Sequence, residues 1–154
     1  MLGRGRLVIL FGASLHNFMK NSLPVRTAAL LGFLAVALGA FGAHGLKELL
    51  ERNQTATIWE KAVLYHFIHT VMLFVLANRA SFHSGPWVAF LIGILIFSGS
   101  LYLLAVTNLR WLGAITPFGG LSFLVGWLWL VFQPTKSSAS PGDTNGHQPG
   151  PIRG

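Results

Sequence analysis

The chain has 154 residues, of which 53% are hydrophobic and only 10% are charged. Soluble domains carry about a quarter charged residues, so this chain cannot cover itself with a soluble surface, and its length suits one domain. The formal charge of +7 comes from basic residues scattered at the borders of apolar runs, which is typical of membrane-flanking charge and not of a nucleic-acid groove. With no cysteine, the sequence excludes disulfides, thiolate metal sites and cysteine nucleophiles.

The first 24 residues form a basic extension that contains no acidic residue. Its apolar run, Leu7 to Leu15, is too short to span about 30 Å of hydrocarbon. Three interpretations remain open: a cytoplasmic extension, a start codon placed too early, or a basic organelle-targeting peptide. We expect residues 1–24 to be poorly structured.

The first predicted span runs from about Val25 to Gly45 and is organised around the stretch GAFGAHGLK at its end. Small residues recur in it four positions apart in two series, first Ala28 and Gly32, then Ala35, Gly39 and Ala43. Such spacing lets two helix backbones approach closely, which drives association in lipid. We therefore predict a helix-packing face that includes Gly42 and places His44 at an interface. A cleaved signal peptide ending near Ala40 and Gly42 is a minor alternative.

A short amphipathic segment, Leu46 to Asn53, separates the first two spans and is predicted to lie flat on the membrane surface. Next, Thr57 and Glu60 fit a capping box, with Thr57 as the N-cap of the following helix. The second predicted span then covers residues 59–78, with Trp59 at the headgroup level.

The third predicted span covers residues 87–107, after a turn at Ser84 to Pro86. The fourth covers residues 111–132 and contains Pro117, which predicts a kink between Gly113 and Gly120. Residues 133–154 lack apolar periodicity and are predicted to be a disordered tail.

Four spans place both ends of the chain on one side of the membrane. Seven basic residues fall on that side: Arg4, Arg6, Lys20, Arg26, Arg79, Lys136 and Arg153. Four fall on the other: Lys47, Arg52, Lys61 and Arg110. The excess predicts that both termini are cytoplasmic.

Four motifs in order, GAFGAHGLK, WEKAVLYHFIHT, FSGSLY and ITPFGGLSFLVGW, resemble one family of small membrane proteins of bacteria and mitochondria. This is the family of domain of unknown function 423, also called the transmembrane protein 256 family. The resemblance covers residues 25–132 and implies a four-helix integral membrane protein, without implying a biochemical activity. The positions that match the motifs are Gly39, Gly42, His44, Tyr65, His69, Ser98, Gly99, Tyr102, Thr116, Pro117, Gly119 and Gly120.

Polar side chains within the spans are the candidates for function, because such groups at membrane depth normally face a bundle interior or a cavity. His69, with Tyr65 one turn before it, is the strongest candidate. We expect a structural role for His69, as an interhelical hydrogen bond to Ser98, Ser100, Tyr102 or a carbonyl near Pro117. The candidate polar intramembrane site consists of Tyr65, His69, Ser98, Tyr102 and Thr116.

Other chemistry has weaker support in the sequence. His44, His66 and His69 could ligate a metal or haem, but nothing fixes their geometry. The only Asp is Asp143 in the tail, so a Ser-His-Asp triad is excluded, leaving at most a dyad of Ser98 or Ser100 with His69. Thr116-Pro117 could also mark a transporter-like broken helix. We predict no catalytic residue, no metal and no cofactor.

The sequence thus predicts an all-α membrane protein, a bundle of four transmembrane helices with an amphipathic surface helix between the first two. We expect a structural or accessory protein, not an enzyme, that packs against itself or a larger membrane complex. The alternative is a small permease or channel with a polar site around His69. The expected surroundings are the lipid bilayer of the bacterial inner membrane, or else a mitochondrial membrane, with no nucleic-acid partner.

Overall fold

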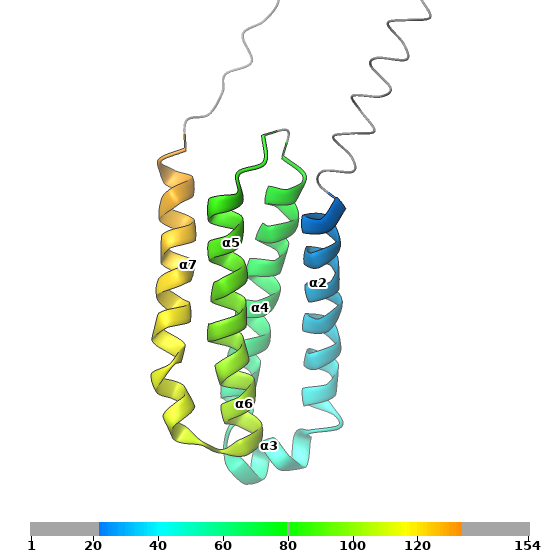
Figure 1. Ribbon diagram of the computed structural model, residues 1–154. Helices are drawn as coiled ribbons and strands as arrows, with labels where there is room; N and C mark the ends of the chain where they lie inside the picture. The colour runs from blue at the N-terminus through cyan, green and yellow to red at the C-terminus, as the bar shows by residue number, and fades with distance from the viewer. Residues whose placement is uncertain (1–21, 80, 134–154) are drawn as a thin grey trace, which may run out of the picture.

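The computed structural model describes residues 22–79 and 81–133, so the predictions for residues 1–21 and for the tail from 134 lie outside the described residues. The described part of the chain is helical (Figure 1). Its elements are α2 (Ser22–Ala43), α3 (Lys47–Asn53), α4 (Ala56–Ala77), α5 (Ser84–Gly93), the π-helical turn η1 (Ile94–Ser98), α6 (Gly99–Thr107), the 3-10 helix η2 (Arg110–Ala114) and α7 (Thr116–Val131).

Four helical stretches are long and apolar enough to cross a membrane: Leu23–Ala43, Ala56–Ala77, Ser84–Thr107 and Arg110–Val131. Each has 21 to 24 residues, and about 20 residues at 1.5 Å per residue match the hydrocarbon thickness. The predicted all-α, four-span architecture is confirmed. Each span begins one to three residues before its predicted start, and α2 takes in the last residues assigned to the extension.

The corner between α3 and α4 is held by tertiary hydrogen bonds, and the predicted capping box at Thr57 is wrong. The N-cap of α4 is Thr55, and no side-chain capping bond is formed there. The Thr55 hydroxyl instead donates to the Ala105 carbonyl (2.8 Å), and the Asn53 amide donates to the same oxygen (3.1 Å). The Ala105 carbonyl lies in the last turn of α6, where carbonyl groups have no partner within the helix. The bonds to this carbonyl favour a start of α4 after Thr55 over the predicted capping box at Thr57.

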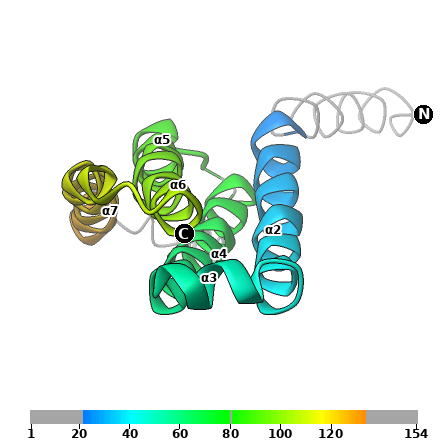
Figure 2. The ribbon, with the colours of Figure 1, turned by 90° about the horizontal axis from the view of Figure 1, so that it is seen from below.

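The four spans form an open arrangement, and not a closed ring. Among the described helices, α2 packs against α4 and α3, whereas α7 packs against α5, η1 and η2. The third span, made of α5, η1 and α6, lies between α4 and α7 (Figures 1 and 2). Seen along the helices, α2 and α7 lie far apart on opposite flanks, and α3 crosses beneath the ends of α2 and α4 (Figure 2).

The small-residue face of α2 is used against α4 of the same chain. Ala28 and Ala35 are 1% and 0% exposed. A Cβ on Gly39 would lie 3.3 Å from a Val63 methyl group, and the Trp59 ring covers Gly42. At the end of this face, however, Ala43 and His44 are exposed. The predicted packing face is therefore real, but it ends at Gly42.

Glycines also set the packing between α5 and α7. The Phe90 ring lies over Gly126, and in exchange the Phe123 ring lies over Gly93. Gly119 approaches backbone instead of a ring, because a Cβ there would lie 2.3 Å from the backbone nitrogen of Phe97 in η1. This glycine set brings the third and fourth spans together along their length.

Pro117 does not kink a continuous helix, as the sequence predicted. The chain is 3-10 helical over η2, and α7 begins at Thr116, so Pro117 falls in the first turn. The missing N–H of proline is harmless at that position, where α-helical N–H groups have no partner in any case. The irregularity therefore lies where it was expected, between Gly113 and Thr116, but as a change of helix type.

Candidate functional site

His69 lies inside the protein with both ring nitrogens in hydrogen bonds. Its Nδ1 lies 2.8 Å from the Tyr65 carbonyl oxygen, and the Trp127 indole N–H donates to its Nε2 (3.3 Å). A carbonyl only accepts, so the proton is on Nδ1 and the Nε2 lone pair receives the indole proton. The ring also stacks on Phe123, with centroids 3.5 Å apart. His69 is thus a neutral cross-link between α4 and α7.

An interhelical hydrogen bond was expected from His69, but the expected partners were wrong. Ser98, Ser100, Tyr102 and the carbonyls near Pro117 do not bond to it; Trp127 does. Trp127 lies toward the end of the fourth span, and tryptophans at such positions commonly lie at the membrane interface. A tryptophan can equally donate its indole N–H to a buried imidazole. Only the arrangement of the helices shows which of these two roles Trp127 has.

His66 and Tyr102 form a second polar pair, on a different side of α4. Their Nδ1 and hydroxyl oxygen lie 3.3 Å apart, and the Tyr102 ring packs edge-on against Trp59 with centroids 4.7 Å apart. The Trp59 indole in turn donates to the Leu38 carbonyl of α2 (3.1 Å). This chain of contacts joins α2, α4 and α6, and it does not include His69.

The remaining candidates form a third group at the start of α7. The Ser100 and Thr116 hydroxyl oxygens lie 2.9 Å apart and connect α6 to α7. Ser98, at the end of η1, is 1% exposed, and its hydroxyl has no hydrogen-bond partner among the described residues. The five residues of the predicted polar site therefore divide among separate contacts, and the structure does not gather them at one point.

The histidines are also dispersed. His44 is exposed at the end of α2, whereas His66 and His69 bond to Tyr102 and Trp127. Within residues 22–79 and 81–133, no group of three His, Cys, Asp or Glu side chains could hold a metal ion. A site built on all three histidines has no geometric support in the described part of the chain.

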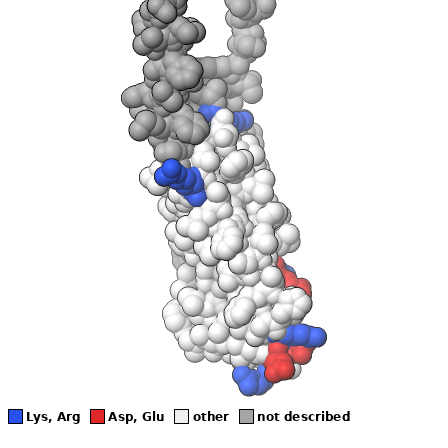
Figure 3. Space-filling view, turned by 90° about the vertical axis from the view of Figure 1, so that its right-hand side faces the viewer, with Lys and Arg blue, Asp and Glu red and all other residues white. Residues whose placement is uncertain are grey.

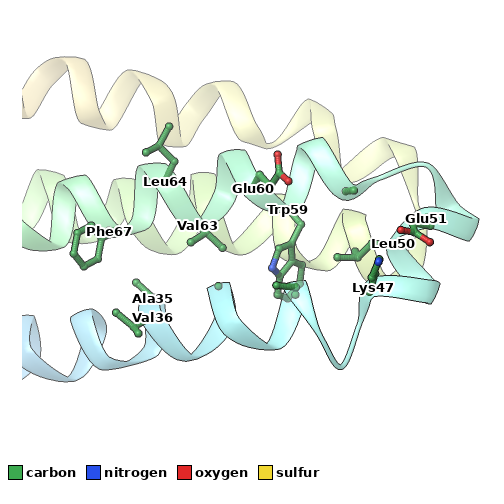
Figure 4. A pocket seen from close by; sticks show the side chains of 14 residues that line it. Ala35, Val36, Lys47, Leu50, Glu51, Trp59, Glu60, Val63, Leu64 and Phe67 are labelled. Carbon is green, nitrogen blue, oxygen red and sulfur yellow. The ribbon is translucent and has the colours of Figure 1, made fainter.

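Two grooves in the described structure could receive another molecule. The α2–α4 groove, of about 680 Å³, lies at the α3 end; it is lined by Ala35, Val36, Gly39, Gly42, Ala43, Lys47, Leu50, Glu51, Ala56, Trp59, Glu60, Val63, Leu64 and Phe67 (Figure 4). The α4–α7 groove, of about 720 Å³, is lined by Leu64, Tyr65, Ile68, His69, Phe97, Pro117, Gly120, Leu121, Phe123, Leu124 and Trp127. Leu64 lines both, so α4 forms the ridge between them.

Comparison with known proteins agrees with this four-span structure. A family model described as "Protein of unknown function (DUF423)" matches residues 38–120. The chain belongs to the DUF423 family. It is 44% identical over 115 residues to the UPF0382 membrane protein YwdK of Bacillus subtilis, covering 70% of this chain and 92% of that protein. It is 40% identical over 114 residues to the UPF0382 inner membrane protein YgdD of Escherichia coli, covering 71% and 86%.

These matches confirm the family resemblance, and with the four apolar helices they show that the DUF423 chain is an integral membrane protein. A third relative, the UPF0382 membrane protein SH2409 of Staphylococcus haemolyticus, is 44% identical over 113 residues, covering 70% of this chain and 91% of that protein. No solved structure matches the chain. The family model includes most residues of both grooves, from Leu38 to Gly120.

Proposed function

We propose that this DUF423 protein is a structural or accessory membrane protein, not an enzyme, and that it assembles with a second copy of itself through the α4–α7 groove. The observation that carries the proposal is the groove itself, which is open at membrane depth and contains no charged side chain. Helices associate in lipid through close packing, which small residues such as Gly120 permit by leaving the backbone of α7 uncovered.

The same face supplies a ridge that fits such a groove. Leu64 and Ile68 of α4 are 54% and 45% exposed and stand beside the groove. Around a twofold axis along the membrane normal, the ridge of each copy can enter the groove of the other, which gives a closed dimer. Tyr65, 40% exposed in the groove, adds a polar group that gains from contact with protein, because polar groups are costly in lipid.

The α2 face, the basis of the sequence prediction of assembly, is the less suitable surface, because α4 of the same chain covers it. The transport alternative also has less support than the sequence suggested. Both nitrogens of His69 take part in hydrogen bonds, so the ring offers neither a free proton acceptor nor a free donor to a permeating species.

Assembly is tested by Gly120→Leu. The larger side chain fills the α4–α7 groove and is expected to shift the protein from dimer to monomer in native mass spectrometry from lipid nanodiscs. A Cβ at position 120 meets only the Phe97 ring edge, at 3.7 Å, so the fold should tolerate the change. Gly99→Leu is the matched control: a Cβ there meets nothing within 4 Å, and position 99 lies outside the groove.

Two outcomes would contradict the assembly proposal. One is a wild-type protein that stays monomeric at every protein-to-lipid ratio, or that travels with a different membrane protein instead of a second copy. The other is a Gly120→Leu variant that remains as dimeric as Gly99→Leu.

We further propose that the protein lies in the bacterial inner membrane with both termini in the cytoplasm. The E. coli relative is named an inner membrane protein. In the described residues, acidic and basic side chains lie together at the α3 end, whereas the basic side chains at the opposite end have no acidic neighbour in view (Figure 3). α2 begins and α7 ends at the latter end (Figure 1). Over the whole sequence, seven basic residues belong to this side and four to the α3 side, and that excess of Lys and Arg supports cytoplasmic termini.

Orientation is tested by single cysteines, since the natural chain has none. Ser81→Cys, in the loop after α4, and Gln54→Cys, at the α3–α4 corner, are both exposed and mark opposite ends. In intact spheroplasts, a membrane-impermeant thiol reagent is expected to label position 54 and to leave position 81 unlabelled until the cells are lysed. The reverse pattern would place the termini outside.

A further inference from the structure

We infer that the α2–α4 groove binds one membrane phospholipid whose headgroup carries a primary amine. The α2–α4 groove differs in its side chains from the α4–α7 groove. It ends in charged side chains at the membrane surface, whereas the α4–α7 groove has none. The inference goes beyond the proposed assembly and does not depend on it.

The deep part of the groove suits an acyl chain. Its walls toward mid-membrane are the apolar side chains of Val36 on α2 and of Val63, Leu64 and Phe67 on α4 (Figure 4). Ala35 and Gly39 of α2 line the floor of the groove, where α2 packs against α4. A hydrocarbon chain fills such an irregular apolar slot and gains dispersion contacts with both helices.

The surface end of the groove suits a headgroup. Lys47 and Glu51 stand one turn apart on α3 and so share a face, and Glu60 lines the groove from the first turns of α4 (Figure 4). All three side chains are exposed. Leu50 of α3, 3% exposed, lines the groove beside them. A lipid entering sideways from the bilayer would therefore bring its headgroup to this rim.

The charges at the rim select among headgroups. One ammonium, on Lys47, complements the lipid phosphate. The carboxylates of Glu51 and Glu60 lie apart along the rim (Figure 4) and are alternative partners for a cationic amine. A primary amine donates hydrogen bonds to carboxylates, whereas a trimethylated amine has no N–H to donate. An anionic headgroup without an amine would meet two carboxylates and be repelled. The rim thus fits phosphatidylethanolamine better than phosphatidylcholine or phosphatidylglycerol.

The headgroup preference is tested by native mass spectrometry of the full-length protein, titrated separately with these three phospholipids. Wild type is expected to bind one phosphatidylethanolamine in preference to the other two. The double variant Glu51→Gln/Glu60→Gln should bind it about tenfold more weakly, the loss expected for charge-assisted hydrogen bonds. Glu48→Gln is the matched control, since Glu48 is exposed on the same helix but does not line the groove.

The acyl-chain site is tested by a pair of tryptophan variants on α2. Val36→Trp fills the groove and should abolish the bound lipid whatever its headgroup; Ala37→Trp, at an exposed neighbouring position outside the groove, should not. Equal binding of all three lipids would overturn the proposal, as would an equal loss of binding in Glu48→Gln and the double variant. Lipid retained by Val36→Trp at the level of Ala37→Trp would overturn the location.

Discussion

Gly119→Ala is expected to destabilise the protein by about 3 kcal/mol or more, the upper end of the cost of overpacking a well-packed core. The added Cβ would lie 2.3 Å from the backbone nitrogen, 2.7 Å from the Cα and 2.8 Å from the Cβ of Phe97. These are backbone or near-backbone atoms, so no side chain can rotate away. To remove this clash, α7 must move away from η1. That movement disturbs the neighbouring contacts in which Phe90 packs over Gly126 and Phe123 packs over Gly93. The measurement is the thermal unfolding midpoint of the purified protein.

Gly120→Ala is the control, one position along the same helix. Its Cβ would meet only the Phe97 ring, at 3.7 and 3.8 Å, which is ordinary contact. Because alanine favours helix over glycine by about 1 kcal/mol, this variant should unfold at the wild-type temperature or above it. Equal unfolding temperatures for the two variants would show that the close approach at Gly119 does not hold the third and fourth spans together.

Gly119 lies opposite the π-helical turn η1, an irregularity of the third span that the sequence did not predict. Phe97 and Ser98 belong to η1, where the helix widens before returning to α6. An inserted residue of this kind rotates the later part of the helix relative to the earlier part. Ser98 and Ser100 are both buried, at 1% and 6% exposure, although they are two positions apart, in a span that packs against both α4 and α7. A uniform helix across residues 87–107 could not predict that arrangement.

The four spans and the α2 packing face could be predicted because they depend on local features, namely apolar length and four-residue spacing. Which face of each helix is inside could not, because lipid-facing and buried residues are equally apolar. Phe118 is 68% exposed and Phe90 is 0% exposed, yet nothing local distinguishes them. One signal in the sequence was missed: Gly119, Ser122 and Gly126 repeat every three or four positions, the same kind of pattern that identified the face on α2.

The polar residues show the same limit. His69, Ser98 and Ser100 are buried, as expected of polar groups that avoid lipid, whereas Tyr65 of the same predicted site is 40% exposed. The hydrogen-bond partners of these residues depend on which helices are neighbours and on how far the helices are shifted along their axes. The sequence determines neither locally. Thr55 is the clearest example, because its bond to Ala105 joins residues 50 positions apart and overrides a plausible local cap two residues later.

His69→Ala is expected to be the second strongly destabilising change, costing about 2–4 kcal/mol, in the range of large-to-small core substitutions. It removes the ring stacked on Phe123 and leaves the Trp127 indole N–H without its acceptor. His69→Phe keeps an aromatic ring at the stack and removes the hydrogen bonds, so it should cost only about 1 kcal/mol. Thermal unfolding of both variants separates the packing contribution from the polar one.

The hydrogen bond between α4 and α7 is isolated by combining His69→Phe with Trp127→Phe in a double-mutant cycle. Hydrogen bonds between membrane helices contribute about 0.6 kcal/mol on average, so a coupling energy of about that size is expected. A role of His69 in transport predicts the opposite result: His69→Phe would abolish a flux in liposomes while the unfolding temperature stays at the wild-type value. Both ring nitrogens of His69 form hydrogen bonds, one within α4 and one to α7. We therefore expect His69 variants to lower the stability of the protein.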